Sequence, residues 1–494
     1  MTTPTPTTAQ TPPSSTWVDE SAEPQPTTEP VKVDHPSQAE RSAAGKAARA
    51  RAPLSGHAAF DTDGRTDPIA LLETQAGSRV PELVPIRYGR MSSSAFAFYR
   101  GGALIMAADL AKSPNSGLQV QLCGDAHMSN FGTYASPERR LVFDINDFDE
   151  THPGPFEWDV KRLAASLAVA GRENGYSTKK RRRIVLSAAT GYREAMRSFA
   201  KQGNLAVWYS HADLADMMEE IGRQLDSRRK ATTQLALDKA RSRDSVQALA
   251  KLTTVVDGRV RIVSQPPLIV PFEELLEGEA IEAAYDNLRH LIRSYRRTLQ
   301  SDRRHLLEGF KLVQMARKVV GVGSVGTRAW ILLFEGLNGQ DPLFLQAKEA
   351  QASVLSGYTR ASRIRNQGQR VVAGQQLMQA TSDIFLGWQR AAGLDGIERD
   401  FYVRQLRDGK GSVVVETMVP DGMAFYARVC GQALARAHAR SGDRVAIGAY
   451  LGSTSRFDEA IADFATSCAD QNERDHSALT AAIASGRVSA QTGL

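Results

Sequence analysis

The sequence has few cysteines and no long apolar run. Only three cysteines, Cys123, Cys430 and Cys468, occur in 494 residues, too few and too far apart for a disulfide framework or a metal knuckle. No apolar stretch approaches the roughly 18 residues that a membrane span requires. The first residues are rich in Thr and Pro rather than basic and then apolar, so no secretory leader is expected. These absences favour a cytoplasmic protein without a membrane span.

Histidine and strong charge are also scarce. The chain has nine His residues and a formal net charge of +6, which comes mainly from scattered Arg. This balance suits anionic ligands but does not by itself indicate nucleic acid. The one basic run, at residues 179–183, lies near a predicted helix start and lacks interleaved aromatic residues, so no nucleic-acid partner is expected.

What the sequence does have is an ordinary globular composition behind a biased N-terminus. Hydrophobic residues make up 42% and charged residues 23% of the chain, enough for one large core or two medium cores. Residues 1–52 are rich in Thr, Pro, Ser, Ala and Glu with almost no large apolar side chains. Such a segment cannot bury enough surface to offset its ordering entropy, so we expect a disordered tail.

Two polar segments near residue 130 carry the first chemical signal. Asp125 and Asn130 lie five positions apart after the strand-like residues 118–122, and Asp147 follows a second apolar run. This is the order that a kinase-type site needs, where one Asp accepts or orients the substrate hydroxyl and an Asn and a later Asp hold magnesium. Mg²⁺ prefers one or two such oxygen ligands together with phosphate and water. We therefore expect Asp125 as the catalytic residue and Asn130 and Asp147 as metal ligands.

Two other interpretations of this stretch exist. Gly-Asp and Asn-Asp pairs are common formers of turns and helix caps. The run Gly124-Asp125-Ala126-His127 also resembles one motif of the two-metal phosphoesterases, although no Gly-Asn-His or Gly-His-x-His run accompanies it. In the kinase-type interpretation His127 is a loop residue rather than a metal ligand.

Several neighbouring residues are candidates for supporting roles. Asp159 lies in the first turn of a predicted helix, where the helix dipole favours a carboxylate that can brace the preceding loop. Asp149 belongs to the same acidic cluster as Asp147. Arg87, Arg90 and Arg100 could reach a phosphate or could pair on the surface.

A second half of a nucleotide site is indicated far downstream. Gly321, Gly323 and Gly326 form a Gly-x-Gly-x-x-Gly pattern, with Ser324 inside it, between two apolar runs rich in β-branched residues. Flanking strands favour a glycine-rich hairpin whose backbone N–H groups approach phosphate oxygens, rather than a dinucleotide-binding turn. Lys348 follows near the end of the next predicted strand, where a lysine can neutralise α- and β-phosphates.

The order of these halves is reversed relative to an ordinary kinase, in which the glycine loop and lysine come first. The simplest reconciliation is a circular permutation of an α+β, two-lobed, protein-kinase-like fold. The expected parts are residues 53–310 as a catalytic-loop and helical lobe, residues 311–422 as a smaller β-rich nucleotide lobe, and residues 423–494 as helices that pack back on the helical lobe.

These motifs also resemble a known family. The runs Gly124-Asp125-Ala126-His127 and Asp147-Phe148-Asp149-Glu150, together with residues 158–163, 402–405 and 438–443, are similar to those of the bacterial domain-of-unknown-function 2252 family. The resemblance covers about residues 55–470. It implies membership of the protein-kinase-like superfamily, near the aminoglycoside and choline phosphotransferases, and assigns no substrate.

The sequence therefore predicts an ATP- and Mg²⁺-dependent phosphotransferase that acts on an unidentified hydroxyl acceptor, with a small molecule favoured. Cys123 stands where those phosphotransferases have His, and no Glu occurs between Glu349 and Glu398 to pair with Lys348. Glu349 itself would point to the opposite face of its strand. These departures leave three alternatives: a non-catalytic nucleotide-binding pseudokinase or regulatory module, a nucleotidyl transferase, and a metallophosphoesterase.

Overall fold

The computed structural model of the chain describes residues 34–216, 245–257, 259–276, 280–393, 395–406, 411 and 413–493. The chain divides into two units, residues 1–37 and residues 38–494. Of the first unit, residues 34–37 are described and have no regular secondary structure.

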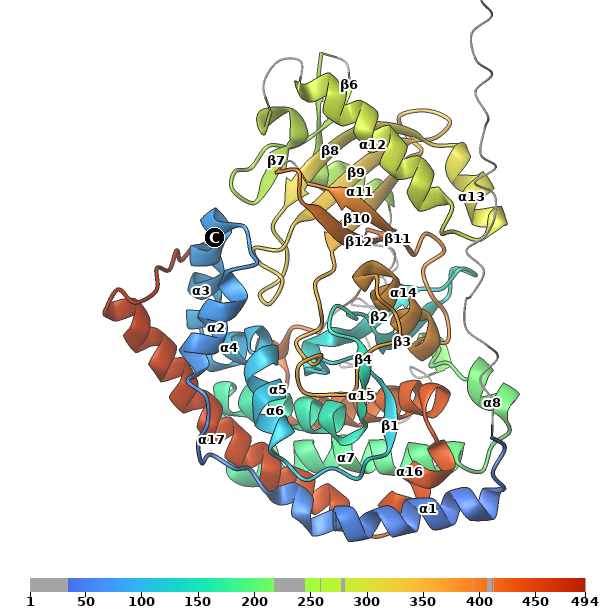
Figure 1. The fold of residues 1–494 in the computed structure, drawn as a ribbon, viewed down its shortest axis with the longest axis vertical. Helices are drawn as coiled ribbons and strands as arrows, with labels where there is room; N and C mark the ends of the chain where they lie inside the picture. The colour runs from blue at the N-terminus through green and yellow to red at the C-terminus, as the bar shows by residue number, and fades with distance from the viewer. Residues whose placement is uncertain are drawn as a thin grey trace, which may run out of the picture. The chain divides into compact units, whose positions relative to one another are not determined.

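The second unit is a mixed α+β fold (Figure 1). Its N-terminal part contains five helices: α1 (Gln38–Arg51), α2 (Pro68–Ala76), α3 (Val84–Ser92), α4 (Ala95–Gly101) and α5 (Ala103–Ala111). Local sequence signals set several of these boundaries. Asp67 caps α2, which has Pro68 at its first position, and the Ser94 side chain accepts a hydrogen bond from Ala97 N at the start of α4, as expected for helix N-termini.

Two small antiparallel ribbons follow α5. Strand β1 (Gln119–Leu122) pairs with β4 (His152–Pro155), and β2 (Phe131–Ala135) pairs with β3 (Leu141–Ile145). In Figure 1 these ribbons lie between the large sheet and the helices beneath it. Polar loops that leave these strands are therefore held at the level where the two parts of the fold meet.

The helical part is organised around α6 (Glu157–Glu173), whose residues from Glu157 to Gly171 are all buried. Its apolar side chains share one core with α7 (Thr178–Phe199) and the C-terminal helices. Such all-round burial is typical of a central helix enclosed by others. The remaining helices here are α8 (Asn204–Tyr209), α15 (Pro420–Ser441), α16 (Arg444–Leu451) and α17 (Arg456–Ala484).

The main sheet is antiparallel and has six strands in the order β11-β12-β10-β9-β8-β7. Its strands are β7 (Ile269–Pro271), β8 (Lys311–Lys318), β9 (Ala329–Glu335), β10 (Pro342–Glu349), β11 (Gly387–Ala392) and β12 (Glu398–Gln405). Four further helices and one hairpin belong to this part: α11 (Ser245–Leu252), α12 (Ala280–Arg296), α13 (Ser301–Glu308), α14 (Gln367–Met378), β5 (Thr253–Val256) and β6 (Arg259–Ile262).

Both faces of the sheet are covered, and strand alternation assigns each side chain to one of them. Leu332 and Phe334 of β9 pack with Leu288 of α12. The intervening Ile331 packs on the other face with Leu252 of α11. In Figure 1, α12 and α13 lie across the sheet at the top of the view, and α14 lies below it, next to β2 and β3.

The N-terminal helix α1 lies within the segment expected to be a disordered tail. Gly45 abuts the backbone of Ala446 in α16, and Arg49 donates to the carbonyls of Ala449 and Tyr450 at 2.8 Å each. An Ala-rich, polar helix gains its order here from these tertiary contacts, which a composition argument does not detect. The expectation for residues 1–33 lies outside the described residues.

The boundary expected at residue 310 also differs from the structure. Strand β7 pairs with β8, and Phe272, Leu288 and Tyr295 belong to the core between the sheet and α12. The chain therefore enters the sheet part by residue 245, and α11, α12 and α13 pack with the sheet. The last helix, α17, continues to Ala484.

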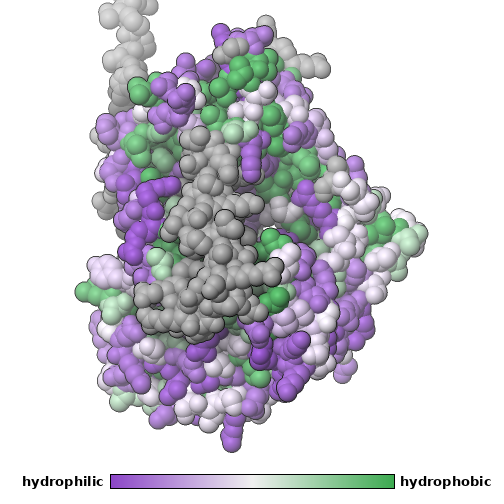
Figure 2. All heavy atoms as spheres, turned by 180° about the vertical axis from the view of Figure 1, so that it is seen from behind, coloured by the Kyte–Doolittle hydropathy of each residue, from purple (hydrophilic) through white to green (hydrophobic). Residues whose placement is uncertain are grey.

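Within the part of the chain that the structure describes, no helix has the length and apolar character needed to cross a membrane. The back of the molecule carries apolar side chains mainly in its upper part, around the sheet, whereas polar side chains dominate the lower, helical part (Figure 2).

Candidate functional site

The Gly-Asp loop, residues 123–130, leaves β1 through a turn that requires glycine. Gly124 has φ +85°, and a Cβ at this position would lie 2.1 Å from the carbonyl oxygen of Glu150. A side chain would meet both a strained backbone conformation and a backbone clash. The turn therefore brings residues 123–130 against the acidic segment at residues 147–150.

Buried groups of α6 and α15 hold the Gly-Asp loop from behind. Asp159, only 1% exposed, accepts hydrogen bonds from Cys123 N at 2.8 Å and Gly124 N at 3.1 Å. His438 Nε2 lies 3.2 Å from the same carboxylate, and its Nδ1 lies 2.9 Å from the hydroxyl of Tyr192. This arrangement explains why a carboxylate stands in the first turn of α6: it satisfies two backbone N–H groups that the turn leaves unpaired.

Asp125 faces the opposite way, into a cavity. Its Oδ1 accepts from Arg162 Nε at 2.8 Å and lies 2.7 Å from the terminal nitrogen of the same guanidinium. His127 Nε2 is 3.7 Å from Asp125 Oδ2. Burial lowers the pKa of His127 to about 3; Asp125 opposes this shift, and Arg100 and Arg162 reinforce it. Because His127 is neutral and Arg162 binds Oδ1 of Asp125, the other oxygen, Oδ2, can accept a proton or a hydrogen bond from a ligand.

Asn130 and Asp147 offer oxygen ligands next to Asp125. Asn130 Nδ2 donates to the backbone oxygen of Asp125 at 2.8 Å, which fixes the amide with its Oδ1 as the remaining polar atom. Asp147 lies in the turn after β3, where its Oδ1 accepts from Asp149 N at 3.3 Å. Among the described residues no group of three or more His, Cys, Asp or Glu is arranged to hold a metal. An amide oxygen and one carboxylate nevertheless match the small protein ligand set typical of Mg²⁺.

The glycine loop, residues 319–328, connects β8 and β9 as a hairpin. Gly321 and Gly326 have φ +65° and +90°. Ser324 Oγ donates to Asp149 Oδ2 at 3.2 Å, and a guanidinium nitrogen of Arg90 donates to the carbonyl of Gly321 at 2.6 Å. The loop therefore touches both the acidic segment and α3, although it comes from a distant part of the sequence.

Lys348, near the end of β10, is buried and forms an ion pair with Asp149. Tyr402, its partner on β12, donates to the other oxygen of Asp149 at 2.7 Å. Burial alone would lower the pKa of Lys348, but the charge of Asp149 outweighs it, and Tyr402 and Asp147 add to the net rise. Glu349 points to the other face of the strand, where it accepts from Arg328. The acidic partner of Lys348 is therefore Asp149, an aspartate of the 147–149 segment, rather than a glutamate.

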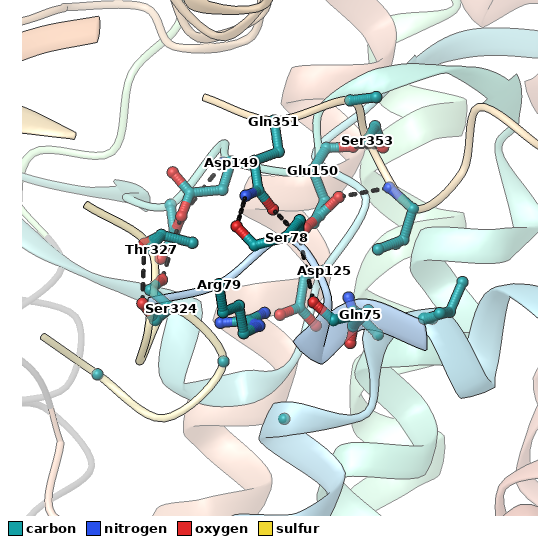
Figure 3. Close-up of a pocket in the computed structure, with 18 of the residues that line it drawn as sticks. Gln75, Ser78, Arg79, Asp125, Asp149, Glu150, Ser324, Thr327, Gln351 and Ser353 are labelled. Carbon is teal, nitrogen blue, oxygen red and sulfur yellow. Dashed lines mark hydrogen bonds between the residues drawn. The ribbon is translucent and has the colours of Figure 1, made fainter. Parts of the chain in front are cut away.

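Two adjoining cavities open between these elements. The larger, about 710 Å³, contains Asp125 and His127, and the smaller, about 390 Å³, contains Lys348. Residues from five separate stretches of the chain converge on the larger cavity in Figure 3, namely Gln75, Ser78, Arg79, Asp125, Asp149, Glu150, Ser324, Thr327, Gln351 and Ser353. Both cavities are lined by the same five of the residues singled out in the sequence: Arg100, Asn130, Asp147, Gly321 and Ser324.

The remaining sequence candidates take different positions. Asp149 and Gly323 line the larger cavity. Asp159 lies behind the Gly-Asp loop, as its hydrogen bonds show. Arg90 contacts the backbone of the glycine loop, and Gly326 accepts a hydrogen bond from Val80 N at the base of that loop.

Sequence reasoning missed Arg79, Arg162 and Tyr402. Arg162 belongs to the quoted run at residues 158–163 and stacks over the ring of Tyr99 at 4.0 Å. Its position one turn after Asp159, on the same buried helix, is the signal that could have identified it. Arg79 lies between α2 and α3 and belongs to no motif, so only the tertiary structure identifies it.

A family model described as "Uncharacterized protein conserved in bacteria (DUF2252)" matches residues 79–482. No curated protein and no solved structure gives a significant match. The matched range includes the Gly-Asp loop, the glycine loop and Lys348.

Proposed function

This chain belongs to the family of uncharacterised bacterial proteins that shares the DUF2252 domain, and we propose that it is an ATP- and Mg²⁺-dependent phosphotransferase acting on a small hydroxyl-bearing acceptor. The proposal assigns it a two-lobed, circularly permuted protein-kinase-like fold. In this fold the sheet part is the nucleotide lobe.

One observation carries the proposal. Asn130 and Asp147 line the same cavity as Gly321, Ser324 and Lys348, although about 200 residues of chain separate the two sets. Phosphoryl transfer depends on positioning and charge stabilisation rather than on covalent chemistry by the protein. A glycine loop, a buried lysine and metal-binding oxygens on one cavity are the groups that such a reaction requires.

The residues present fit a magnesium ion. Asn130 Oδ1 and the Asp147 carboxylate would hold it, because Asn130 Nδ2 is already committed to the backbone of Asp125 and hard oxygen ligands suit this ion. The ion would supply neutralisation of the charge that develops on the phosphates.

The chain's own residues then divide the remaining tasks. Asp125 Oδ2 accepts the proton of the acceptor hydroxyl, while Arg162 holds Oδ1 and fixes the carboxylate. Backbone N–H groups of the glycine loop approach the phosphate oxygens, and Lys348 and Arg100 offset their charge. His127 stays neutral because burial holds its pKa near 3.

The circular permutation is supported at the end of α15. Gln121 N of β1 donates to Ser441 Oγ at 3.2 Å, and a Cβ on Gly442 would lie 2.8 Å from the carbonyl of Gln119. The C-terminus of α15 thus abuts the strand that leads into the Gly-Asp loop. A chain running directly from α15 into β1 would restore the usual kinase order of sheet, helix and catalytic loop.

A second candidate function is a nucleotide-binding module without catalysis. The observation that favours it is the ion pair of Lys348 with Asp149, whose other oxygen accepts a hydrogen bond from Tyr402. A lysine held by a neighbouring carboxylate is less available to phosphates. In an active enzyme the incoming phosphates must compete with Asp149 for this ammonium group.

Thermal unfolding with nucleotide tests both candidates. Mg²⁺-ATP is expected to raise the unfolding midpoint of the wild-type protein by several degrees, as ligand binding to the folded state requires. The rise should be much smaller without Mg²⁺ and in Asp147→Asn or Lys348→Ala. If Mg²⁺-ATP leaves the wild-type midpoint unchanged, both candidates are wrong.

Turnover separates the two candidates. If the chain is an enzyme, Asp125→Asn should keep Mg²⁺-ATP binding but lower ATP consumption in the presence of acceptor by about 100-fold or more. A surface variant with a similar change of charge, Asp463→Asn on α17, serves as the matched control. Binding without any consumption by the wild-type protein, across a panel of metabolites, favours the non-catalytic module.

A further inference from the structure

The larger cavity is lined by three arginines that make no ion pair with another described residue, namely Arg79, Arg87 and Arg100. Arg79 is 7% exposed and Arg87 is fully buried. The Nε groups of Arg79, Arg87 and Arg100, and one terminal nitrogen of Arg87, are buried without a hydrogen-bond partner among the described residues. Arg79 and Arg87 donate only to neutral acceptors, namely Val325 O for Arg79 and Gln75 Oε1 and Gly101 O for Arg87.

The acidic residues of the same cavity do not compensate these charges. Asp125 is paired with Arg162, Asp149 with Lys348, and Glu349 with Arg328. Glu150 accepts a hydrogen bond from Val354 N, and burial raises the pKa of its carboxyl group, which favours the neutral form. Among the described carboxylates that line this cavity, Asp147 is the one outside these pairs. In the proposed site it binds the metal.

Uncompensated charge inside a protein is unfavourable unless something pairs with it. Burial lowers the pKa of Arg87 well below its ordinary value and acts in the same direction on Arg79 and Arg100. The three guanidinium groups are buried, lack an ion pair among the described residues and line one cavity of about 710 Å³. They therefore form a preorganised site for an anion. Guanidinium binds phosphate and carboxylate in particular, since its N–H groups match their oxygens in pairs.

We infer that the acceptor is a small polyhydroxylated anion, a phosphate ester or a carboxylate, whose anionic group binds Arg79 and Arg87 while one of its hydroxyl groups faces Asp125. This inference rests on the proposed function for the identity of the cavity as the acceptor site. In the reaction, the acceptor oxygen forms a bond to the γ-phosphorus of ATP and its proton passes to Asp125 Oδ2. The bond between the γ-phosphorus and the bridging oxygen breaks, and ADP leaves with its electron pair.

Other groups around the cavity suit the body of such a molecule. Gln75, Ser78, Gln351 and Ser353 contribute amide and hydroxyl groups to the lining (Figure 3), which can exchange hydrogen bonds with several hydroxyl groups. Aminoglycosides and choline, the acceptors of the phosphotransferases to which the motifs are similar, are cations. The arginines disfavour such acceptors by like-charge repulsion.

The test measures ligand binding by the full chain in the absence of nucleotide. Thermal unfolding and calorimetric titration would be recorded with glucose 6-phosphate, gluconate, sorbitol and choline at constant ionic strength. Glucose 6-phosphate, gluconate or both should raise the unfolding midpoint by a few degrees, and the anion that does so identifies phosphate or carboxylate. Sorbitol and choline should have no effect. The inference is overturned if no anion binds, or if sorbitol or choline stabilises the protein equally.

Variants locate the bound anion. Arg79→Gln should raise the dissociation constant of the anion about tenfold or more. Arg182→Gln, which makes the same change of charge on the exposed face of α7, should leave that constant unchanged. Arg79 also donates to Val325 O. Arg100→Gln, which loses no hydrogen bond to another described residue, therefore provides a second variant of the same arginine cluster should Arg79→Gln fail to fold. If Lys348→Ala abolishes anion binding while Arg79→Gln and Arg100→Gln keep it, the anion occupies the nucleotide cavity and the inference is wrong.

A failure of the proposed function is distinguishable from a failure of this inference. Loss of Mg²⁺-dependent stabilisation by ATP, with anion binding intact and dependent on Arg79, refutes the phosphotransferase and retains an anion site. Stabilisation by Mg²⁺-ATP without binding of any anion refutes the anion site and retains the proposed function.

Discussion

The Gly-Asp loop and the glycine loop, which both line the larger cavity, are held in very different ways. The Gly-Asp loop is fixed by buried groups: Asp159 accepts from two of its N–H groups, and Ser166 and Tyr426 bond to the nitrogen and oxygen of Met128. The glycine loop is anchored at Val325, which is buried, but its residues 319–324 are exposed or half-buried and are held by bonds from Ser324 to Asp149 and from Arg90 to the carbonyl of Gly321. The Gly-Asp loop therefore forms a fixed surface of the cavity, whereas the glycine loop can change its position.

This contrast has a physical meaning for a site that must admit and release a ligand. Groups that orient a reacting hydroxyl must be positioned closely, and buried hydrogen bonds provide that. A loop that covers phosphates must open on a microsecond-to-millisecond scale, and few buried contacts make this possible. The predictions that follow test this contrast from its strongest contact to its weakest.

Removal of the Asp159 carboxylate should have the largest effect. Asp159→Ala leaves Cys123 N, Gly124 N and His438 without their acceptor in a buried site, so the free energy of unfolding should fall by about 3–5 kcal/mol. Urea denaturation followed by circular dichroism measures it. Asp463→Ala, which removes an exposed partner of Arg182, should change it by less than about 0.5 kcal/mol. A loss below about 1 kcal/mol for Asp159→Ala would contradict the view that this loop is fixed from behind.

The buried His127 should give the fixed loop a characteristic pH dependence. Its folded-state pKa, about 3, lies below the unfolded value near 6.5. Between these values the unfolded chain binds a proton that the folded chain does not, so stability falls as the pH drops through this window. His127→Asn removes this penalty, and its stability deficit relative to wild type should shrink by about 2 kcal/mol between pH 7 and pH 5. Urea denaturation at both pH values checks this, and a constant deficit would mean that His127 titrates normally.

The weakest contact is expected to control motion rather than stability. Ser324→Ala loses one partly exposed hydrogen bond to Asp149, so the free energy of unfolding should change by less than about 1 kcal/mol. Amide hydrogen exchange of residues 319–328 should nevertheless become several-fold faster, with residues 123–130 unchanged. Equal acceleration in both loops would remove the distinction between them.

Several features of this architecture could be predicted from the sequence because they depend on local patterns. An alternating pattern located β1, and an apolar run behind the glycine pattern located β10. The glycine spacing between apolar runs indicated a hairpin loop, and the strand period put Lys348 and Glu349 on opposite faces. The mixed α+β class and the family resemblance are confirmed by the structure and by the family model.

What the sequence could not predict depends on contacts between distant segments. The pairing of Lys348 with Asp149 joins residues 199 positions apart, and neither residue carries a local sign of the other. Arg79 carries no sign of a site in the sequence, and for Arg87 the sequence leaves phosphate binding and surface pairing both open, because only burial distinguishes them. The helix α1 escaped prediction for a similar reason, because its order depends on α16.

The hydrogen bond from Asn130 Nδ2 to the backbone oxygen of Asp125 has a consequence for how substitutions in the Gly-Asp loop combine. Asn130→Asp exchanges the donor for an acceptor and sets a carboxylate against that carbonyl, which displaces Asp125 together with the oxygen proposed to bind metal. The proposed proton acceptor, Asp125, and the proposed metal ligand, Asn130, are thus structurally coupled. The free-energy changes of Asp125 and Asn130 substitutions should not add, and a double-mutant cycle would measure that coupling directly.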